Sequence, residues 1–228
     1  MSDHWVCIGH SHVGAIAGCG APNLDVIDFW VAGPLWDDTD EGIRFRPDIV
    51  ERVAKGSQVL SMIGGFAHYI LGAAEHPRPF DFVLPSRPDL PFDDSRLLVP
   101  ADAVRAKLTE MGGPQIDPLS ELVRISNGPV VHIAPPPPAV DIQIVEYPVD
   151  PFEGRRVVAP KWVRYKIWRL HCEIIEAHCN QNGIRFLPPP AAATDDDGFL
   201  LPEYRLSDFL HGNAGYGALV LEQLGRVW

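Results

Sequence analysis

Residues able to carry out nucleophilic catalysis stand near both ends of this 228-residue sequence. Ser11 lies in the run GHSH (9–12), and Asp208 and His211 are three positions apart close to the other end. A serine hydroxyl is a weak nucleophile until a base takes its proton, and a histidine oriented by a carboxylate can act as that base. By their types alone, Ser11 can equally be a helix N-cap, and Asp208 and His211 a surface pair. The elements that position these residues decide between the two interpretations.

Short apolar runs alternate with amphipathic segments and predict strands and helices in turn. Strands are expected at 4–9, 24–32, 57–64, 129–134 and 184–187. Helices are expected at 11–19, 47–55, 100–112, 160–182 and 213–224. The alternation predicts an α/β fold, a three-layer α/β/α sandwich with a central parallel five-stranded sheet of the flavodoxin-like kind. Ligands of such sheets bind at the carboxyl ends of the strands, and Ser11 follows the first of them.

Two long proline-rich stretches interrupt this alternation, at about 72–99 and 135–160. Proline accounts for 23 of the 228 residues, which is about twice the usual share. Loops of this length in a compact domain are usually functional or disordered, and we interpret these two as walls or a lid over the strand ends. The expected organisation is one domain over 1–228 that carries these two insertions.

Charge and segment composition exclude several partners. The 19 Lys and Arg and 30 Asp and Glu residues give a net charge of −11, and a surface of this sign repels nucleic-acid phosphates. No stretch approaches the roughly 18 apolar residues of a membrane-spanning helix. The first residues, MSDHWVCIGHSHVG, lack the pattern of a signal peptide, and the four cysteines lack the spacing of a disulfide scaffold. We therefore expect a cytoplasmic protein with no nucleic-acid or membrane partner.

Four short blocks, in their order along the chain, resemble those of the SGNH hydrolases, also called the GDSL esterase and lipase family. The blocks are GHSH (9–12), where the family has Gly-Asp-Ser, then Gly33, then Gly64-Gly65-Phe66, where the family has Gly-x-Asn, and finally Asp208-x-x-His211. The resemblance runs from the first strand to the last helix and implies the SGNH form of the three-layer fold. It also implies a serine hydrolase that cleaves a carboxylic ester through an acyl-enzyme, with Ser11 as nucleophile, His211 as base and Asp208 as its orienter.

Two positions depart from the family pattern. His10 replaces the aspartate before the serine, and Phe66 stands where the asparagine of the oxyanion hole is expected. By resemblance, the oxyanion hole consists of the backbone N–H groups of Ser11 and Gly33, with His68 as the candidate third donor. The alternative for His68 is a packed or solvent-facing loop histidine. Since phenylalanine has no donor, a site lacking this group is expected to be slower by about 10²–10³.

Further predictions concern the ligands. The expected substrate-binding residues are His10, His12, Phe66 and Asn213, and the expected partner is a small-molecule acyl ester. No cofactor and no metal are expected, because the His-Cys pairs at 171–172 and 178–179 lie about 10.5 Å apart along a helix, too far to share one ion. The basic residues between 155 and 166 are interpreted as a solvated helix face. The oligomeric state stays open.

Two other functions stay open beside ester hydrolysis. An acyltransferase would pass the same acyl-enzyme to an alcohol or amine, and proline-rich walls that exclude water favour it. A binding protein with weakened catalysis is favoured by Phe66 in place of the asparagine. Acceptor-dependent product formation identifies the first, and failure of a serine-reactive phosphonate to label Ser11 identifies the second.

Overall fold

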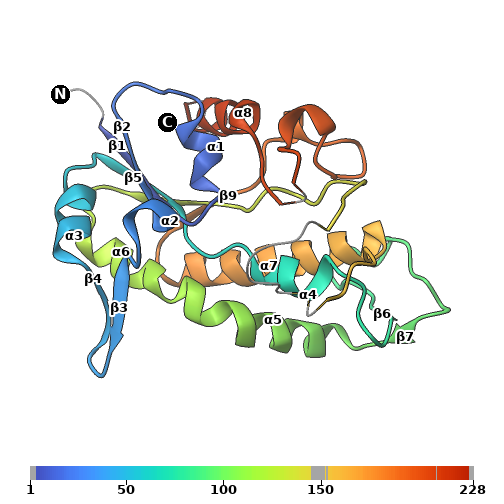
Figure 1. Ribbon diagram of the computed structural model, residues 1–228. Helices are drawn as coiled ribbons and strands as arrows, with labels where there is room; N and C mark the ends of the chain where they lie inside the picture. Colours follow the sequence, from blue (N-terminus) through green and yellow to red (C-terminus); the bar gives the residue numbers. More distant parts are fainter. Residues whose placement is uncertain (1–3, 145–151, 153, 209, 226–228) are drawn as a thin grey trace.

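The computed structural model describes residues 4–144, 152, 154–208 and 210–225. Its centre is a five-stranded sheet in the order β2-β1-β5-β8-β9 (Figure 1). The strands are β1 (Trp5–Gly9), β2 (Leu24–Asp28), β5 (Gln58–Met62), β8 (Val130–Ile133) and β9 (Arg185–Leu187). Every neighbouring pair in this sheet is parallel, so all five carboxyl ends lie along one edge.

Helices cover both faces of the sheet, because successive strand residues point to opposite sides. Val6 and Ile8 of β1 pack in one cluster with α3 (Pro47–Ala54) and α6 (Pro118–Ile125). Cys7 packs in another cluster with α1 (Val13–Ala17) and α8 (Ala214–Gly225). Figure 1 shows α1 and α8 on one side of the sheet and α3, α6 and α7 (Lys161–Gln181) on the other. The predicted three-layer α/β/α sandwich with a parallel five-stranded sheet is confirmed.

The main differences from the sequence-based expectation lie directly after β2. The strand expected over 24–32 ends at Asp28, and residues 29–32 form a short helix, α2 (Phe29–Ala32). Asp28 causes the change, since its side chain accepts a hydrogen bond from the backbone N–H of Trp30 at 2.8 Å and caps the helix. A hairpin of β3 (Trp36–Thr39) and β4 (Gly42–Phe45) follows and projects from the sheet (Figure 1).

The first proline-rich insertion folds into a lobe that shares its core with two neighbouring helices. It begins at the end of α4 (Ala67–Gly72) and contains a short parallel pair, β6 (Phe80–Asp81) and β7 (Leu97–Leu98). Phe80, Phe82 and Leu84 pack with the buried faces of α5 (Ala101–Ile116) and α7. A buried ion pair fastens the lobe, since Lys166 Nζ lies 2.5 Å from the Asp81 carboxylate and 3.0 Å from the carbonyl oxygen of Pro91.

The second proline-rich insertion is described only in part, because residues 145–151 and 153 lie outside the described residues. Its first portion, 135–144, follows β8 and reaches the carboxyl edge of the sheet. Two short 3-10 helices, η1 (Ala191–Ala193) and η2 (Pro202–Tyr204), then connect β9 to the segment before α8.

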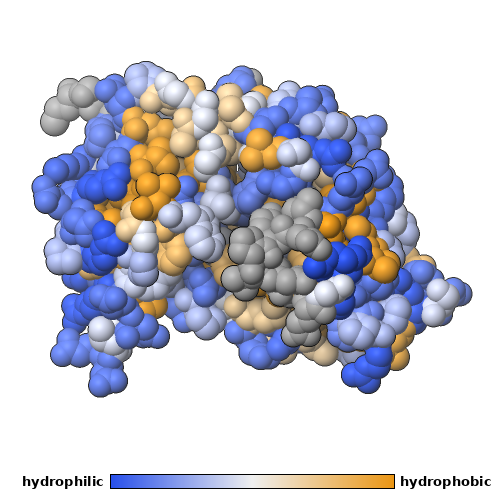
Figure 2. Space-filling view, viewed as in Figure 1, coloured by the Kyte–Doolittle hydropathy of each residue, from blue (hydrophilic) through white to orange (hydrophobic). Residues whose placement is uncertain are grey.

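The surface shown in Figure 2 is mostly hydrophilic, with a hydrophobic patch in the region where Figure 1 places β1 and β2. Within the described part of the chain, no helix is both long and apolar enough to cross a membrane.

Candidate active site

Ser11 lies in the turn between β1 and α1, at the carboxyl edge of the sheet. The turn sits tightly on β5. A side chain at Gly9 would place its first carbon 2.5 Å from the carbonyl carbon and oxygen of Met62, so only glycine fits. The backbone N–H of His10 also donates to the Met62 carbonyl at 3.3 Å. These contacts fix the direction in which the chain leaves β1, and with it the position of the serine.

Asp208 and His211 lie in the loop before α8, which is held by backbone hydrogen bonds. One carboxylate oxygen of Asp208 accepts the backbone N–H groups of Leu210 at 2.9 Å and His211 at 2.8 Å. The other accepts from His211 Nδ1 at 2.8 Å. Burial raises the pKa of Asp208, but the hydrogen bonds from the His211 side chain and from the two backbone N–H groups outweigh it and lower the pKa to about 2. The carboxylate is therefore ionised at neutral pH. Phe209 lies outside the described residues.

The turn that carries Ser11 and the loop that carries His211 meet at one hydrogen bond. His211 Nε2 lies 2.7 Å from Ser11 Oγ, while His211 Nδ1 faces Asp208. The three side chains thus form a continuous line, here called the Ser–His–Asp line. Because the carboxylate can only accept, His211 carries its proton on Nδ1, and its Nε2 is free to take the serine proton.

His10 connects the serine turn to the loop after β5. Its Nδ1 accepts the backbone N–H of Gly64 at 3.1 Å, and its ring packs against Phe29, Trp36 and Phe66 at centroid distances of 5.0, 5.9 and 5.8 Å. Burial lowers the pKa of His10 to about 4, so the ring is neutral. Phe66 is partly exposed and packs beside His10, the residue that precedes Ser11.

His12 is buried beneath the site. Its ring lies 5.1 Å from the His211 ring, between centroids, and close to Gly65. Burial and the neighbouring His211 lower its pKa to about 3. His12 therefore packs, uncharged, against the histidine of the Ser–His–Asp line.

Gly33 follows α2 with a φ of +76°, a conformation that favours glycine. No hydrogen bond within the described residues uses the backbone N–H of Ser11 or Gly33 as donor. These two N–H groups are thus the candidates for binding a developing negative charge, as the resemblance implies.

The element that carries His68 and the partner of its ring differ from those expected. It lies on α4, not in a loop, and its Nδ1 points to His171 Nδ1 on α7 at 3.1 Å. The ring is 8% exposed, and burial lowers its pKa well below the ordinary value, with His171 contributing. No hydrogen bond joins His68 to Ser11 among the described residues, so its role as an oxyanion donor gains no support.

The Asn213 side chain bonds to two neighbouring segments. Its side-chain oxygen accepts the backbone N–H of Tyr216 at 3.1 Å, which caps α8. Its side-chain nitrogen donates to the carbonyl oxygens of Glu203 at 2.8 Å and Arg205 at 3.2 Å. This side chain thus holds η2 and α8 together, and its substrate-binding role stays a prediction.

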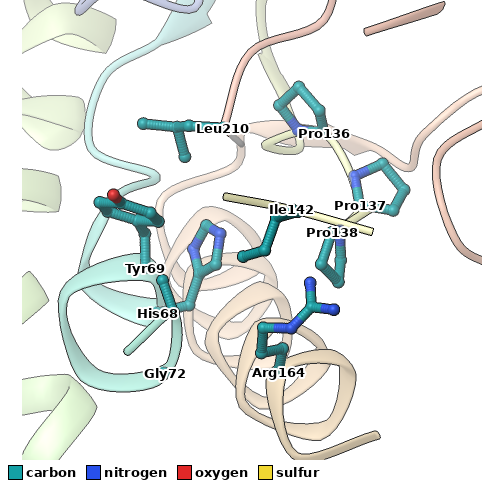
Figure 3. A pocket seen from close by; sticks show the side chains of 10 residues that line it. His68, Tyr69, Gly72, Pro136, Pro137, Pro138, Ile142, Arg164 and Leu210 are labelled. Atoms are coloured by element: carbon teal, nitrogen blue, oxygen red, sulfur yellow. The ribbon is translucent and has the colours of Figure 1, made fainter. Parts of the chain in front are cut away.

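A hollow elsewhere in the described part of the chain includes in its lining Leu210, the residue before His211. Its walls are mostly apolar, and Figure 3 shows His68 between Tyr69 and Ile142, with the prolines beyond. The lining comprises His68, Tyr69, Gly72, Ala73, Pro136, Pro137, Pro138, Ile142, Arg164 and Leu210. The second proline-rich insertion therefore supplies one wall of this hollow.

Sequence reasoning placed two residues of α7 wrongly. Arg164 and Lys166 were expected on a solvated face, but both are buried, at 5% and 1% exposure. Arg164 donates to the carbonyl oxygens of Ala139, Val140 and Ala159, and it reaches the hollow. The sequence does contain a signal for their burial. Every residue of 162–168 other than these two cations is aromatic or aliphatic, which is typical of a helix buried on all sides.

Comparison with known proteins gives fold-level similarities. No protein-family model matches the chain, and no curated protein matches it. Among solved structures, it is similar to a GDSL-like lipase from Bacteroides thetaiotaomicron, with 15% identity over 99% of this chain and 86% of that one and a TM-score of 0.44.

Two further solved structures are similar over nearly their whole length. A phospholipase A1 from Streptomyces albidoflavus has 14% identity over 98% of this chain and 99% of that one, with a TM-score of 0.49. A carbohydrate acetylesterase from Sinorhizobium meliloti has 12% identity over 99% of this chain and 100% of that one, with a TM-score of 0.41. The function of this chain is inferred from its own residues.

Proposed function

We propose that this protein is a serine hydrolase of the SGNH type that cleaves carboxylic esters through an acyl-enzyme on Ser11. The observation that carries the proposal is the Ser–His–Asp line, with 2.7 Å between Ser11 Oγ and His211 Nε2 and 2.8 Å between His211 Nδ1 and Asp208. Residues 200 positions apart rarely adopt this order of donor and acceptor unless they act as a unit. The sequence blocks that resemble the SGNH hydrolases support the same proposal.

The proposed reaction has two halves. Ser11 Oγ attacks the ester carbonyl while His211 Nε2 takes the hydroxyl proton, and the tetrahedral intermediate then expels the alcohol, which receives that proton from His211. Water next attacks the acyl-enzyme, gives a proton to His211, and the serine leaves with it as the carboxylic acid is released. Asp208, held ionised by its hydrogen bonds, stabilises the imidazolium that forms in each half.

The developing oxyanion would be bound by backbone donors. The N–H groups of Ser11 and Gly33, which have no acceptor among the described residues, are the proposed pair. Phe66 would line the rim of the substrate site against His10, as its ring contact supports. A site with two such donors is expected to be active but slower than one with three, by about 10²–10³.

The decisive experiment combines labelling with kinetics. We expect a fluorophosphonate probe to modify Ser11, identified by mass spectrometry of the labelled peptide. We also expect the wild type to hydrolyse short p-nitrophenyl esters, and Ser11→Ala to lose this activity while its circular dichroism stays unchanged. Labelling elsewhere, or undiminished turnover in Ser11→Ala, would remove Ser11 as nucleophile. Product analysis with added alcohols distinguishes hydrolysis from acyl transfer.

A further inference from the structure

Two buried histidines outside the Ser–His–Asp line form a pair that reaches the hollow. His68 on α4 lines the hollow, and His171 on α7 lies behind it at 1% exposure. Their Nδ1 atoms are 3.1 Å apart. With Nδ1 of His68 turned to His171, its Nε2 is the ring nitrogen left for the hollow, and no hydrogen bond within the described residues uses it.

The protonation of this pair is constrained by the hydrogen bond itself. Burial lowers the pKa of His171 to about 4 and that of His68 well below the ordinary value, so both rings are neutral at pH 7. A neutral imidazole carries one N–H proton. A hydrogen bond between the two Nδ1 atoms therefore needs one Nδ1 to be protonated and the other to be unprotonated. Either His171 donates and His68 carries its proton on Nε2, or the reverse holds.

The surroundings of His171 select between these two arrangements. Its Nε2 lies against α5 at Gly112, where an added β-carbon would be 3.2 Å away, and no hydrogen bond among the described residues reaches it. A buried N–H without an acceptor is rarer and more costly than an unpaired lone pair. His171 is therefore expected to hold its proton on Nδ1, where it is bonded, and to leave Nε2 bare. His68 then carries its proton on Nε2.

We propose that His68 is a specificity-determining residue whose Nε2–H binds an acceptor oxygen of the substrate, and that His171 is the positioning residue that fixes its tautomer. The inference rests on the proposed ester hydrolysis. Arg164 supports it, because this buried cation at the same hollow adds positive potential in walls that are otherwise apolar. The substrate class is an ester that carries a second, neutral oxygen in its acyl or alcohol part.

Matched esters test this substrate class. p-Nitrophenyl methoxyacetate and p-nitrophenyl butyrate differ by an ether oxygen in the acyl part, and 2-methoxyethyl acetate and butyl acetate differ by one in the alcohol part. The measured quantity is the kcat/KM ratio within each pair, compared between wild type and variants, so that the intrinsic reactivity of the esters cancels. The pair that responds shows which part of the ester occupies the hollow.

The variants keep or remove one donor at a time. His68→Gln retains an N–H near the Nε2 position, whereas His68→Asn places its amide near Nδ1, away from the hollow. We expect His68→Asn to lower the kcat/KM ratio of the ether-containing ester to its carbon analogue roughly three- to tenfold in one pair, the effect of losing one neutral hydrogen bond. We expect His68→Gln to retain most of this ratio. His171→Asn keeps a donor near Nδ1 and should retain the preference, whereas His171→Gln should reduce it.

Nitrogen-15 NMR of the wild type tests the tautomers without any substitution. We expect the protonated nitrogen to be Nε2 in His68 and Nδ1 in His171, and the reverse assignment would overturn the inference. An unchanged ester ratio in His68→Asn, in both pairs, would also overturn it while leaving the proposed hydrolysis intact. Absence of Ser11-dependent turnover on all four esters together with failed phosphonate labelling would instead count against the proposed function.

Discussion

At the scale of single residues, Asp208 shows how one side chain sets the chemistry of another. Its first oxygen is held by the N–H groups of Leu210 and His211, so its second is aimed at His211 Nδ1. In Asp208→Asn the amide oxygen would keep the two backbone bonds, and the amide nitrogen would donate to Nδ1. His211 would then carry its proton on Nε2 and could not accept one from Ser11.

We therefore expect Asp208→Asn to lower kcat by about 10⁴ while the free energy of unfolding and KM change little. Steady-state kinetics on a p-nitrophenyl ester and urea denaturation measure these quantities. Asp195→Asn is the matched control, because Asp195 also accepts two backbone N–H groups, from Asp197 and Phe199, and has no hydrogen bond to Ser11, His211 or Asp208 among the described residues. Full activity in Asp208→Asn would contradict the tautomer argument.

The residues of the candidate site differ in how far the sequence could reveal them. Ser11, Asp208 and His211 were predictable, because their types and the order of the blocks restrict the chemistry, and the structure brings them together. The pairing of His68 with His171 was not, since the partners are 103 positions apart and each alone is typical of a packed histidine. Contacts between α4 and α7 depend on how two helices cross, which local patterns do not encode.

At the scale of elements, the strands were predicted better than the segments between them. All five core strands lie within apolar runs of the sequence, and each of these runs stops at glycine, proline or a turn. The run 24–32 is mostly apolar, and such a run does not distinguish strand from helix by periodicity, so the prediction of one strand over its whole length is wrong. Asp28 is the readable signal for the change, since its side chain caps α2. The hairpin of β3 and β4 was missed because its acidic residues resemble a loop.

The packing of α8 on α1 depends on a glycine. A β-carbon at Gly217 would lie 2.1 Å from the carbonyl oxygen of Ala15 and 2.7 Å from Cys19 Sγ. We expect Gly217→Ala to lower the free energy of unfolding by about 1–3 kcal/mol, the usual cost of overpacking, and to reduce activity because α8 carries the loop of His211. Urea denaturation measures the first effect.

Gly225→Ala is the control for this prediction, because a β-carbon there meets no atom of the described residues within 4 Å. It lies at the end of the same helix and should cost nothing or stabilise slightly. Equal effects of the two substitutions would show that the contact with α1 is not the cause.

The insertion lobe is fastened to α7 by the buried Lys166–Asp81 pair, with both side chains at 2% exposure or less. Lys166→Met would leave the Asp81 charge buried, and we expect it to cost about 3–5 kcal/mol in the free energy of unfolding. Removing both charges in Lys166→Met with Asp81→Asn should restore part of that loss. Lys107→Met, which breaks an exposed pair with Glu110, is the control and should change little. A loss in Lys166→Met no larger than in the control would refute the role of the pair.

At the scale of the whole molecule, buried neutral histidines govern the response to acid. Burial lowers the pKa of His10 and His171 to about 4, of His12 and His132 to about 3, and of His68 well below the ordinary value. In the unfolded chain each takes a proton near pH 6.5. Between about pH 6.5 and 4 the unfolded state therefore binds more protons than the folded state, and stability falls as pH falls.

Each of these histidines contributes a slope of up to about 1.4 kcal/mol per pH unit. We expect the midpoint of urea unfolding to decrease steeply from pH 7 to pH 5, before carboxylates such as Asp208 begin to take protons. His132→Gln should reduce the slope by about one proton, measured as the change in unfolding free energy per pH unit. A midpoint that stays constant over this range would show that the histidines are not buried in their neutral form.

The meeting of Ser11 with His211 has a consequence for the order in which the protein is made. A ribosome delivers Ser11 200 residues before His211, so a growing chain carries the proposed nucleophile without its proposed base. His211 lies in the loop before α8, and we expect it to reach Ser11 only when α8 docks on α1. Under the proposed mechanism, competence for the reaction therefore waits for this docking. Incomplete products that end before Asp208 are expected to be inert toward esters, however well their sheet had formed.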